Sequence, residues 1–101
     1  RKLMRHGKEL AYHLHALPEV PQVLRFLQQQ CALSDEDAYG TLNMGAGFAL
    51  FVAAGQAQAC VDIAARCGLQ ALVAGQVREG PKAVHIEPLG VHFEAASLAL
   101  R

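Results

Sequence analysis

The sequence predicts an α/β (α+β) fold in which helices cover a mixed β-sheet. Three observations favour this class. Residues 9–17 alternate between apolar and polar side chains, as a strand does. Residues 20–31 and 56–67 carry apolar side chains at helical spacing. Residues 46–54 contain no charged side chain, and both sets of alternating positions are apolar. This pattern is typical of a strand covered on both faces.

The first strand is expected within "ELAYHLHAL", residues 9–17, and Pro18 closes it. Its two faces carry Leu10, Tyr12 and Leu14 on one side and Ala11, His13 and His15 on the other. This alternation makes one face of the strand more apolar than the other, and we expect the more apolar face to lie against the core.

Two helices are expected next. The first spans Val20–Cys31, and Pro21 suits its first turn because a helix leaves that N–H without a partner in any case. Ser34 then predicts the cap of a second, short helix. The three carboxylates Asp35–Asp37 lie in its first turn, where the helix dipole favours negative charge.

An inner strand is expected at Ala46–Ala54, centred on Phe48–Val52, and Gly55 ends it. A third helix follows at Gln56–Cys67, and Gly68 is placed to cap its carboxyl end. The apolar stripe of this helix, which we assign to the core, consists of Ala57, Cys60, Val61, Ala64 and Cys67.

The last two strands are expected within residues 69–77 and 82–89 and are predicted to pair as a hairpin. In the second of these, Val84 and Ile86 should point inward, whereas His85 and Glu87 should point outward. The tail, residues 94–101, has weak helical propensity and receives no assignment.

Composition narrows the possible functions. A chain of 101 residues can form one domain with one modest core. Nine Lys and Arg residues balance nine Asp and Glu residues, so no net field would attract nucleic acid or an anionic membrane. No apolar run is long enough to span a bilayer, and three cysteines without paired spacing indicate a reduced compartment. We therefore expect a soluble, cytoplasmic protein without a nucleic-acid or membrane partner.

The stretch "TLNMGAGFALFV" contains the candidate binding site, formed by Asn43, Gly45 and Gly47. Backbone N–H groups around the two glycines can form an anion-holding nest, and the missing Cβ atoms would let a phosphate approach closely. A purely structural turn is the alternative reading, because no lysine and no helix follow the glycines, as they would in a Walker phosphate loop.

Other chemically active side chains favour structural readings. His13 and His15 share a face and could chelate zinc, but no further ligands are visible nearby in the sequence. Cys31 has no base or positive cluster close in sequence to activate it. Asp35–Asp37 are explained as solvated residues of a helix start. We therefore expect no metal site, and no catalytic residue is assigned.

A family resemblance extends this interpretation. "TLNMGAGFALFV" resembles the Thr-Phe-Asn-Met-Gly-x-Gly segment of the phosphoribosylformylglycinamidine cyclo-ligase family, also called aminoimidazole ribonucleotide (AIR) synthetase. "LPEVPQVLRFLQQQCALSDEDAYGTLNMG" and "LVAGQVREGPKAVHIEPLG" resemble the family's segments around that turn and its closing hairpin. The chain departs at Leu42, where the family commonly has Phe, which keeps an apolar anchor without the ring.

The resemblance implies that residues 1–101 form a single, truncated carboxy-terminal AIR synthetase-like domain, partly resembling a ferredoxin-like layer. The amino-terminal ATP-binding domain of the family is expected to be absent. The parent protein would then be an ATP-dependent cyclo-ligase of purine biosynthesis, and the chain alone would be inactive. The parent would use ATP and Mg, whereas no cofactor is expected in this chain.

The family's reaction closes the imidazole ring of formylglycinamidine ribonucleotide to give AIR. The resemblance therefore implies a ribonucleotide phosphate substrate at Asn43, Gly45 and Gly47, and a homo-oligomer such as a dimer. Two alternatives stay open. The chain could come from another ATP-dependent enzyme of the AIR synthetase superfamily, or it could be a non-catalytic binding or assembly module.

Overall fold

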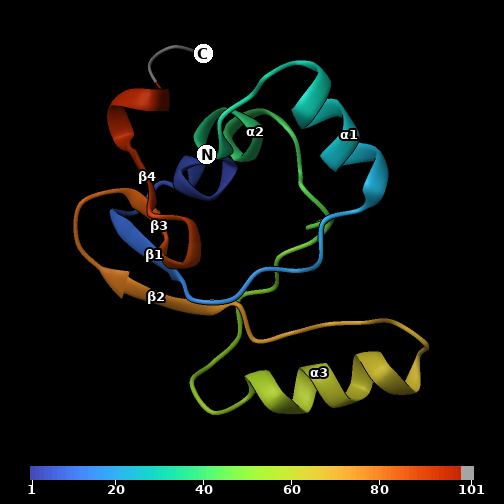
Figure 1. Cartoon of the computed structure of the whole chain (residues 1–101). Coiled ribbons are helices and arrows are strands. Elements are labelled where there is room, and N and C mark those ends of the chain that lie inside the picture. Colours follow the sequence, from blue (N-terminus) through green and yellow to red (C-terminus); the bar gives the residue numbers. More distant parts are fainter. Residues whose placement is uncertain (99–101) are drawn as a thin grey trace.

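The computed structural model describes residues 1–98 and shows an α/β fold built on a mixed sheet of four strands (Figure 1). Residues 99–101, the end of the unassigned tail, lie outside the described residues. The elements are, in order, η1 (Lys2–Arg5), β1 (Leu10–Leu14), α1 (Gln22–Gln30), α2 (Asp35–Thr41), α3 (Ala57–Arg66), β2 (Gly75–Glu79), β3 (Ala83–Ile86), η2 (Glu87–Leu89), β4 (Val91–Glu94) and η3 (Ala95–Leu98). The predicted fold class is confirmed.

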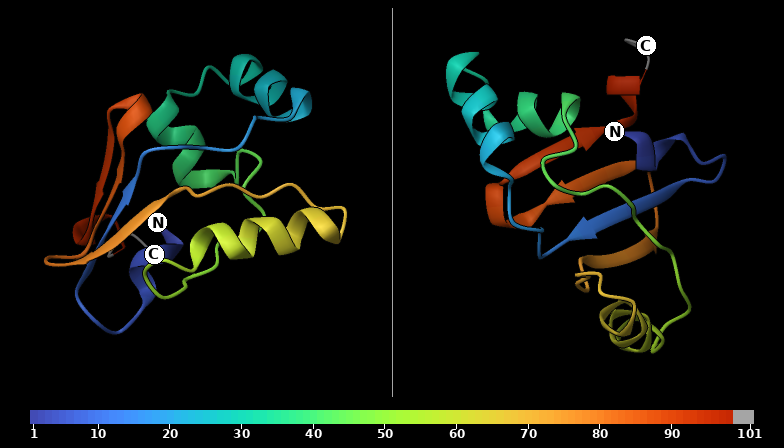
Figure 2. Two further views of the ribbon diagram at one scale, coloured as in Figure 1. Left: turned by 90° about the horizontal axis from the view of Figure 1, so that it is seen from below. Right: turned by 90° about the vertical axis from the view of Figure 1, so that its right-hand side faces the viewer.

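The sheet has the strand order β2-β1-β3-β4. Strand β1 runs antiparallel to β2 and parallel to β3, and β3 runs antiparallel to β4. The parallel connection from β1 to β3 contains all three α-helices and β2. Figure 2 shows that β1 and β3, at the centre of the sheet, come from opposite ends of the chain.

One face of the sheet forms the core. Alternation along the strands places large apolar side chains on this face, as the sequence pattern predicts for β1 and β3. The buried side chains of this cluster are Met4, Tyr12, Val84, Ile86, Val91 and Phe93. Met4 comes from η1, which therefore covers the core face together with Tyr39 of α2.

The predicted helix boundaries follow from recognisable capping groups. The backbone N–H of Asp37 donates to Ser34 Oγ at 3.1 Å, so Ser34 caps α2 as expected. Helix α1 begins at Gln22, two residues later than predicted, so Pro21 is its N-cap residue and not part of its first turn. Gly68 follows α3 with a positive φ of 78°, the left-handed conformation that glycine adopts at helix ends.

The predicted inner strand at Ala46–Ala54 is wrong. None of residues 46–54 belongs to a strand, and the central side chains are exposed, with Phe48 96% and Leu50 77% accessible. A strand needs a partner for its backbone N–H and C=O groups. Strand β1 instead pairs with β2 on one side and β3 on the other, so this run stays outside the sheet.

The predicted pairing of the last two strands is also wrong. Strands β2 and β3 are close in sequence, but β1 lies between them. The hairpin is formed one step later, by β3 and β4 across the η2 turn, where Gly90 has a φ of 63°. Strand β4 was not predicted, although Val91–Glu94 alternates between buried and exposed side chains. The inward positions of Val84 and Ile86 and the outward positions of His85 and Glu87 are confirmed.

The side chains of helices α1 and α3 are less buried than their apolar stripes predict. No residue of either helix is fully buried, and both lie away from the central strands of the sheet (Figure 1). Cys67 is exposed and Cys60 is half-buried, so the core assignment of Cys67 is wrong. No helix within residues 1–98 combines the length and the apolar character needed to cross a membrane.

Candidate functional site

The corner at Asn43–Gly47 forms a tight turn. The backbone N–H of Gly45 donates to Asn43 Oδ1 at 2.9 Å, and the N–H of Ala46 donates to the Asn43 carbonyl oxygen at 2.9 Å. Met44 is buried and has a φ of 49°, and Gly45 has a φ of 95°. An asparagine side chain that accepts from the N–H two residues on is a recognised turn-stabilising device.

The two glycines of the corner have different surroundings. A Cβ atom on Gly45 would lie 2.7 Å from the Glu19 carbonyl oxygen and 3.0 Å from Pro21 Cδ. Gly45 therefore lets the corner pack against the segment before α1. A Cβ atom on Gly47 would meet nothing within 4 Å, and its φ is not in the left-handed region. Only Gly45 has a demonstrable structural need to be glycine.

We expect Gly45→Ala to destabilise the protein by about 2 kcal/mol, because it adds a steric clash to an unfavourable φ. Gly47→Ala should change stability by less than about 0.5 kcal/mol, since its site is open. Urea denaturation followed by circular dichroism measures both. Equal destabilisation by the two substitutions would contradict this account of the corner.

The three residues predicted to bind phosphate are thus brought together, with Asn43 and Gly47 exposed and Gly45 half-buried. Two polar groups of the corner are already paired with each other, namely Asn43 Oδ1 and the N–H of Gly45. The Asn43 side-chain amide remains a neutral donor on the surface of the corner. Binding of phosphate by Asn43, Gly45 and Gly47 stays a prediction.

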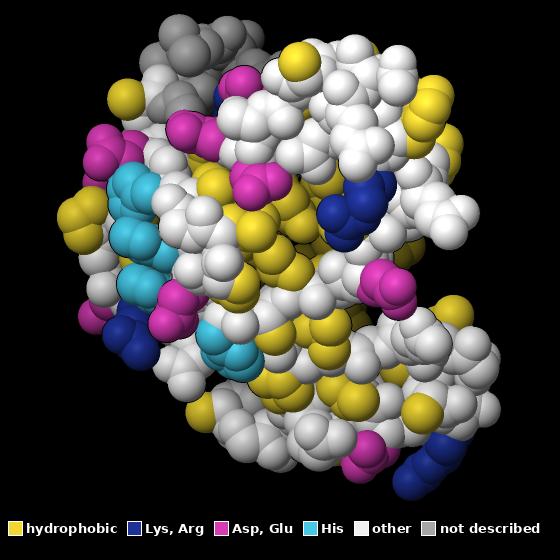
Figure 3. Space-filling model, viewed as in Figure 1, with side chains coloured by type: hydrophobic (Ala, Val, Ile, Leu, Met, Phe, Trp, Pro, Cys, Tyr) yellow, Lys and Arg dark blue, Asp and Glu magenta, His cyan; other side chains and the backbone are white. Residues whose placement is uncertain are grey.

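A second set of polar residues lies on the sheet face opposite the core. The strand register places His13, His85 and His92 side by side on β1, β3 and β4. The rings of His13 and His85 are stacked at a centroid distance of 5.1 Å, and those of His85 and His92 meet edge-on at 4.0 Å. Figure 3 shows histidine side chains gathered in a column over the sheet. We call these three residues the histidine row.

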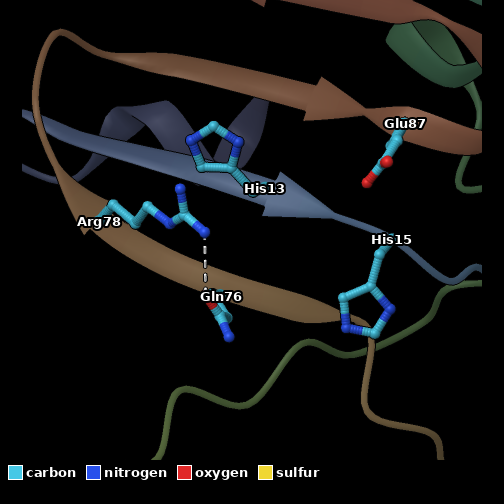
Figure 4. A pocket seen from close by; sticks show the side chains of 5 residues that line it. All are labelled: His13, His15, Gln76, Arg78 and Glu87. Carbon is cyan, nitrogen blue, oxygen red and sulfur yellow. Dashed lines mark hydrogen bonds between the residues drawn. The ribbon is translucent and has the colours of Figure 1, made fainter.

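A shallow hollow of about 310 Å³ lies beside the row on the same face. It is lined by His13, His15, Gln76, Arg78 and Glu87 (Figure 4). The Arg78 guanidinium donates to Gln76 Oε1 at 3.3 Å. His13 and His15, which the sequence places on one face, thus border a common space with an arginine and a glutamate. The corner residues Asn43, Gly45 and Gly47 are not among its lining.

The outer end of the row contains a short chain of polar contacts. His92 Nε2 lies 3.2 Å from Glu94 Oε1, and His92 Nδ1 lies 3.2 Å from His85 Nδ1. Both contacts are satisfied when His92 carries its proton on Nε2 and accepts from Nδ1–H of His85. Burial of its ring, together with the neighbouring His92 and His13, lowers the pKa of His85.

Sequence reasoning missed this cluster. His85 was predicted to point outward, but His92 was not considered, because β4 was not predicted. The sequence does contain a signal for this cluster. His85 and His92 stand at matching positions on the two sides of the turn that ends at Gly90, so a hairpin places both side chains on one face.

The side chains that commonly bind metal ions do not gather in groups of three or more in the described part of the chain. Within residues 1–98, no three His, Cys, Asp or Glu side chains lie close enough to hold an ion together. The carboxylates of Asp35 and Asp37 instead accept hydrogen bonds from Gln28 and Ser34, each at 3.0 Å. The interpretation of Asp35–Asp37 as residues of the helix start agrees with these contacts.

Comparison with known proteins gives one consistent result. The phosphoribosylformylglycinamidine cyclo-ligase of Methanococcus vannielii is 33% identical over 79 residues, which cover 78% of this chain. The protein of the same name from Methanocaldococcus jannaschii is 32% identical over 77 residues, and that from Oceanobacillus iheyensis is 31% identical over 75. The chain is related to the phosphoribosylformylglycinamidine cyclo-ligases. This relationship confirms the family resemblance stated above.

The relationship to the cyclo-ligases has a limited extent. The matched region is 23% of the length of the Methanococcus vannielii protein, 22% of that from Methanocaldococcus jannaschii and 20% of that from Oceanobacillus iheyensis. No family model matches the chain, and no solved structure matches it significantly. The chain is therefore a cyclo-ligase-related domain that corresponds to about a quarter of its relatives.

Proposed function

We propose that this chain is the substrate-side, carboxy-terminal domain of an ATP-dependent cyclo-ligase that closes the imidazole ring of formylglycinamidine ribonucleotide in purine biosynthesis. The observation that carries the proposal is the sequence relationship over 79 residues to proteins with the name phosphoribosylformylglycinamidine cyclo-ligase. The relationship covers most of this chain, so it concerns the domain as a whole rather than one short motif.

The proposed substrate contact is the corner Asn43–Gly47. The substrate carries a ribose phosphate, and its reaction passes through a phosphorylated oxygen. Preorganised neutral donors stabilise such negative charge without adding a mobile cation. The Asn43 amide and the exposed backbone at Gly47 are donors of this kind, and the fixed Asn43–Gly45 hydrogen bond holds the corner in one conformation. ATP and Mg would be bound by other parts of the complete enzyme.

The exposed apolar residues of the chain support contact with further polypeptide in the parent protein. Phe48, Leu50, Phe51 and Ile63 are each more than half accessible, and apolar side chains gathered on a surface mark interaction sites. In the complete cyclo-ligase we propose that further polypeptide, either of the same subunit or of a second one, covers this apolar surface.

A chimera tests the proposal directly. The 79 matching residues of the Methanococcus vannielii cyclo-ligase are replaced by the aligned residues of this chain. The chimera is then assayed for ADP and aminoimidazole ribonucleotide from ATP and formylglycinamidine ribonucleotide. We expect turnover by the chimera and none by this chain alone. A folded chimera that binds ATP but never forms product would instead favour a different superfamily substrate or a non-catalytic module.

A further inference from the structure

The histidine row offers a pair of nitrogen atoms at a spacing that suits one metal ion. His85 Nδ1 and His92 Nδ1 are 3.2 Å apart. Two imidazole nitrogens that each lie about 2.0–2.1 Å from one ion are about 2.9 Å apart in the square-planar arrangement that Cu²⁺ prefers and about 3.3 Å apart in a tetrahedral one, so the observed separation falls within this range. The strand register sets this spacing, because His85 and His92 are direct partners across the β3–β4 hairpin. Both side chains are exposed, so the core does not block rotation of their rings.

We propose that His85 and His92 form a binding site for a divalent late transition-metal ion, with Cu²⁺ bound most tightly. Imidazole is a preferred ligand of copper, zinc and nickel, and the general order of affinity places Cu²⁺ first. The protein supplies two ligands, because no third His, Cys, Asp or Glu within residues 1–98 completes the set. Water molecules fill the remaining coordination positions.

Glu94 strengthens the site through His92. Its carboxylate lies 3.2 Å from His92 Nε2, on the opposite side of the ring from the metal-binding nitrogen. A metal-bound histidine commonly donates its other N–H to a carboxylate, which fixes the tautomer and raises the basicity of the ligand. Glu94 therefore holds the lone pair of His92 on Nδ1, where the ion binds.

The proton balance of binding is simple. With the tautomers assigned above, neutral His85 carries its proton on Nδ1, so this proton leaves to solvent and Nε2 takes up a proton when Nδ1 binds the ion. No net proton is released while both rings are neutral. Acid protonates imidazole nitrogens and competes with the ion, so binding should weaken as the pH falls.

The charges around the pair favour a cation. A hollow of about 550 Å³ borders His85 and His92, and its charged lining residues are Glu9, Glu94 and Lys82. Two carboxylates and one ammonium give this hollow a net negative charge while the histidines are neutral. Both histidines are exposed, so an ion reaches them without movement of the backbone.

The test is a titration with CuCl₂ in a non-chelating buffer at neutral pH, read by isothermal calorimetry and by electron paramagnetic resonance. The three thiols are first removed as Cys31→Ala, Cys60→Ala and Cys67→Ala, because thiols bind and reduce Cu²⁺. We expect one saturable site with hyperfine structure from two nitrogen ligands. The absence of saturable binding would overturn the proposal.

Single substitutions in this background assign the ligands. His85→Ala and His92→Ala should each lower the affinity at least about tenfold, and Glu94→Gln should lower it about tenfold while both nitrogen signals stay. His15→Ala is the matched control and should leave the affinity within about twofold, because His15 lines the hollow beside the row and not the one that borders His85 and His92. Circular dichroism confirms folding of each variant. Loss of the site in the His15 variant, with retention in the His85 and His92 variants, would overturn the assignment.

Discussion

Asn43→Ala in the chimeric cyclo-ligase is expected to lower turnover roughly 100-fold or more, the usual loss when one preorganised donor to a developing negative charge is removed. Steady-state release of ADP with formylglycinamidine ribonucleotide as substrate measures this loss. The hydrogen bond from the Gly45 N–H to Asn43 Oδ1 also disappears. The free energy of unfolding should therefore fall by about 1 kcal/mol, too little to unfold the enzyme.

Asn43→Asp is the control that separates the two roles of Asn43. A carboxylate keeps an oxygen that can accept from the Gly45 N–H, but it lacks the amide donor and repels phosphate. Stability should therefore stay near that of the unsubstituted chimera while turnover is lost. Turnover within a few-fold of the unsubstituted chimera in both variants would mean that the corner is only a turn, and the site assignment would be wrong.

Gly75→Ala is expected to destabilise the protein by about 3 kcal/mol, near the upper end of the range for overpacking. Gly75 begins β2, and a Cβ atom there would overlap the backbone of β1 at His13 and Leu14. The approach is close because both His15 and Ala16 donate their N–H groups to the Ala74 carbonyl oxygen, at 2.8 and 3.1 Å. His15 and Ala16 thus lie opposite the single residue Ala74, and this arrangement makes the start of β2 irregular and tightly curved.

Gly7→Ala is the matched control for Gly75→Ala. Its new Cβ would meet nothing within 4 Å, and its φ is not in the left-handed region. The free energy of unfolding, from urea denaturation, should change by less than about 0.5 kcal/mol. If Gly75→Ala were as mild as Gly7→Ala, the pairing of β2 with β1 would be in doubt.

Local features of the sequence predicted the local features of the structure. The Ser34 cap of α2 and Gly68 after α3 each act on their own neighbours, and both predictions are confirmed. Pro21 marks the start of α1, although it lies just before the helix and not in its first turn. The alternation of Tyr12 and of Val84 likewise predicted which side of each strand meets the core. Such signals depend on a few adjacent residues and need no knowledge of the remaining chain.

Pairing between distant segments could not be predicted in the same way. Residues 46–54 have the composition of an inner strand, but no period in the sequence tells which strands neighbour β1. The same limit applies to the sites. The turn at Asn43–Gly45 was visible as a motif, whereas the contact between His85 and His92 exists only because β3 and β4 pair. The alternation of Val91–Glu94 covers only four residues and does not by itself show that β4 pairs with β3.

The central position of β1 has a consequence for how the molecule folds. Strand β1 is made near the beginning of the chain, but both of its partners, β2 and β3, follow about seventy residues later. Long-range pairing requires closure of a large loop before any strand contact is gained, so folding of such topologies is slow. During synthesis the helices can form early, whereas the four-stranded sheet is complete only after Glu94 has left the ribosome. Until then Leu10, Tyr12 and Leu14 remain without their core.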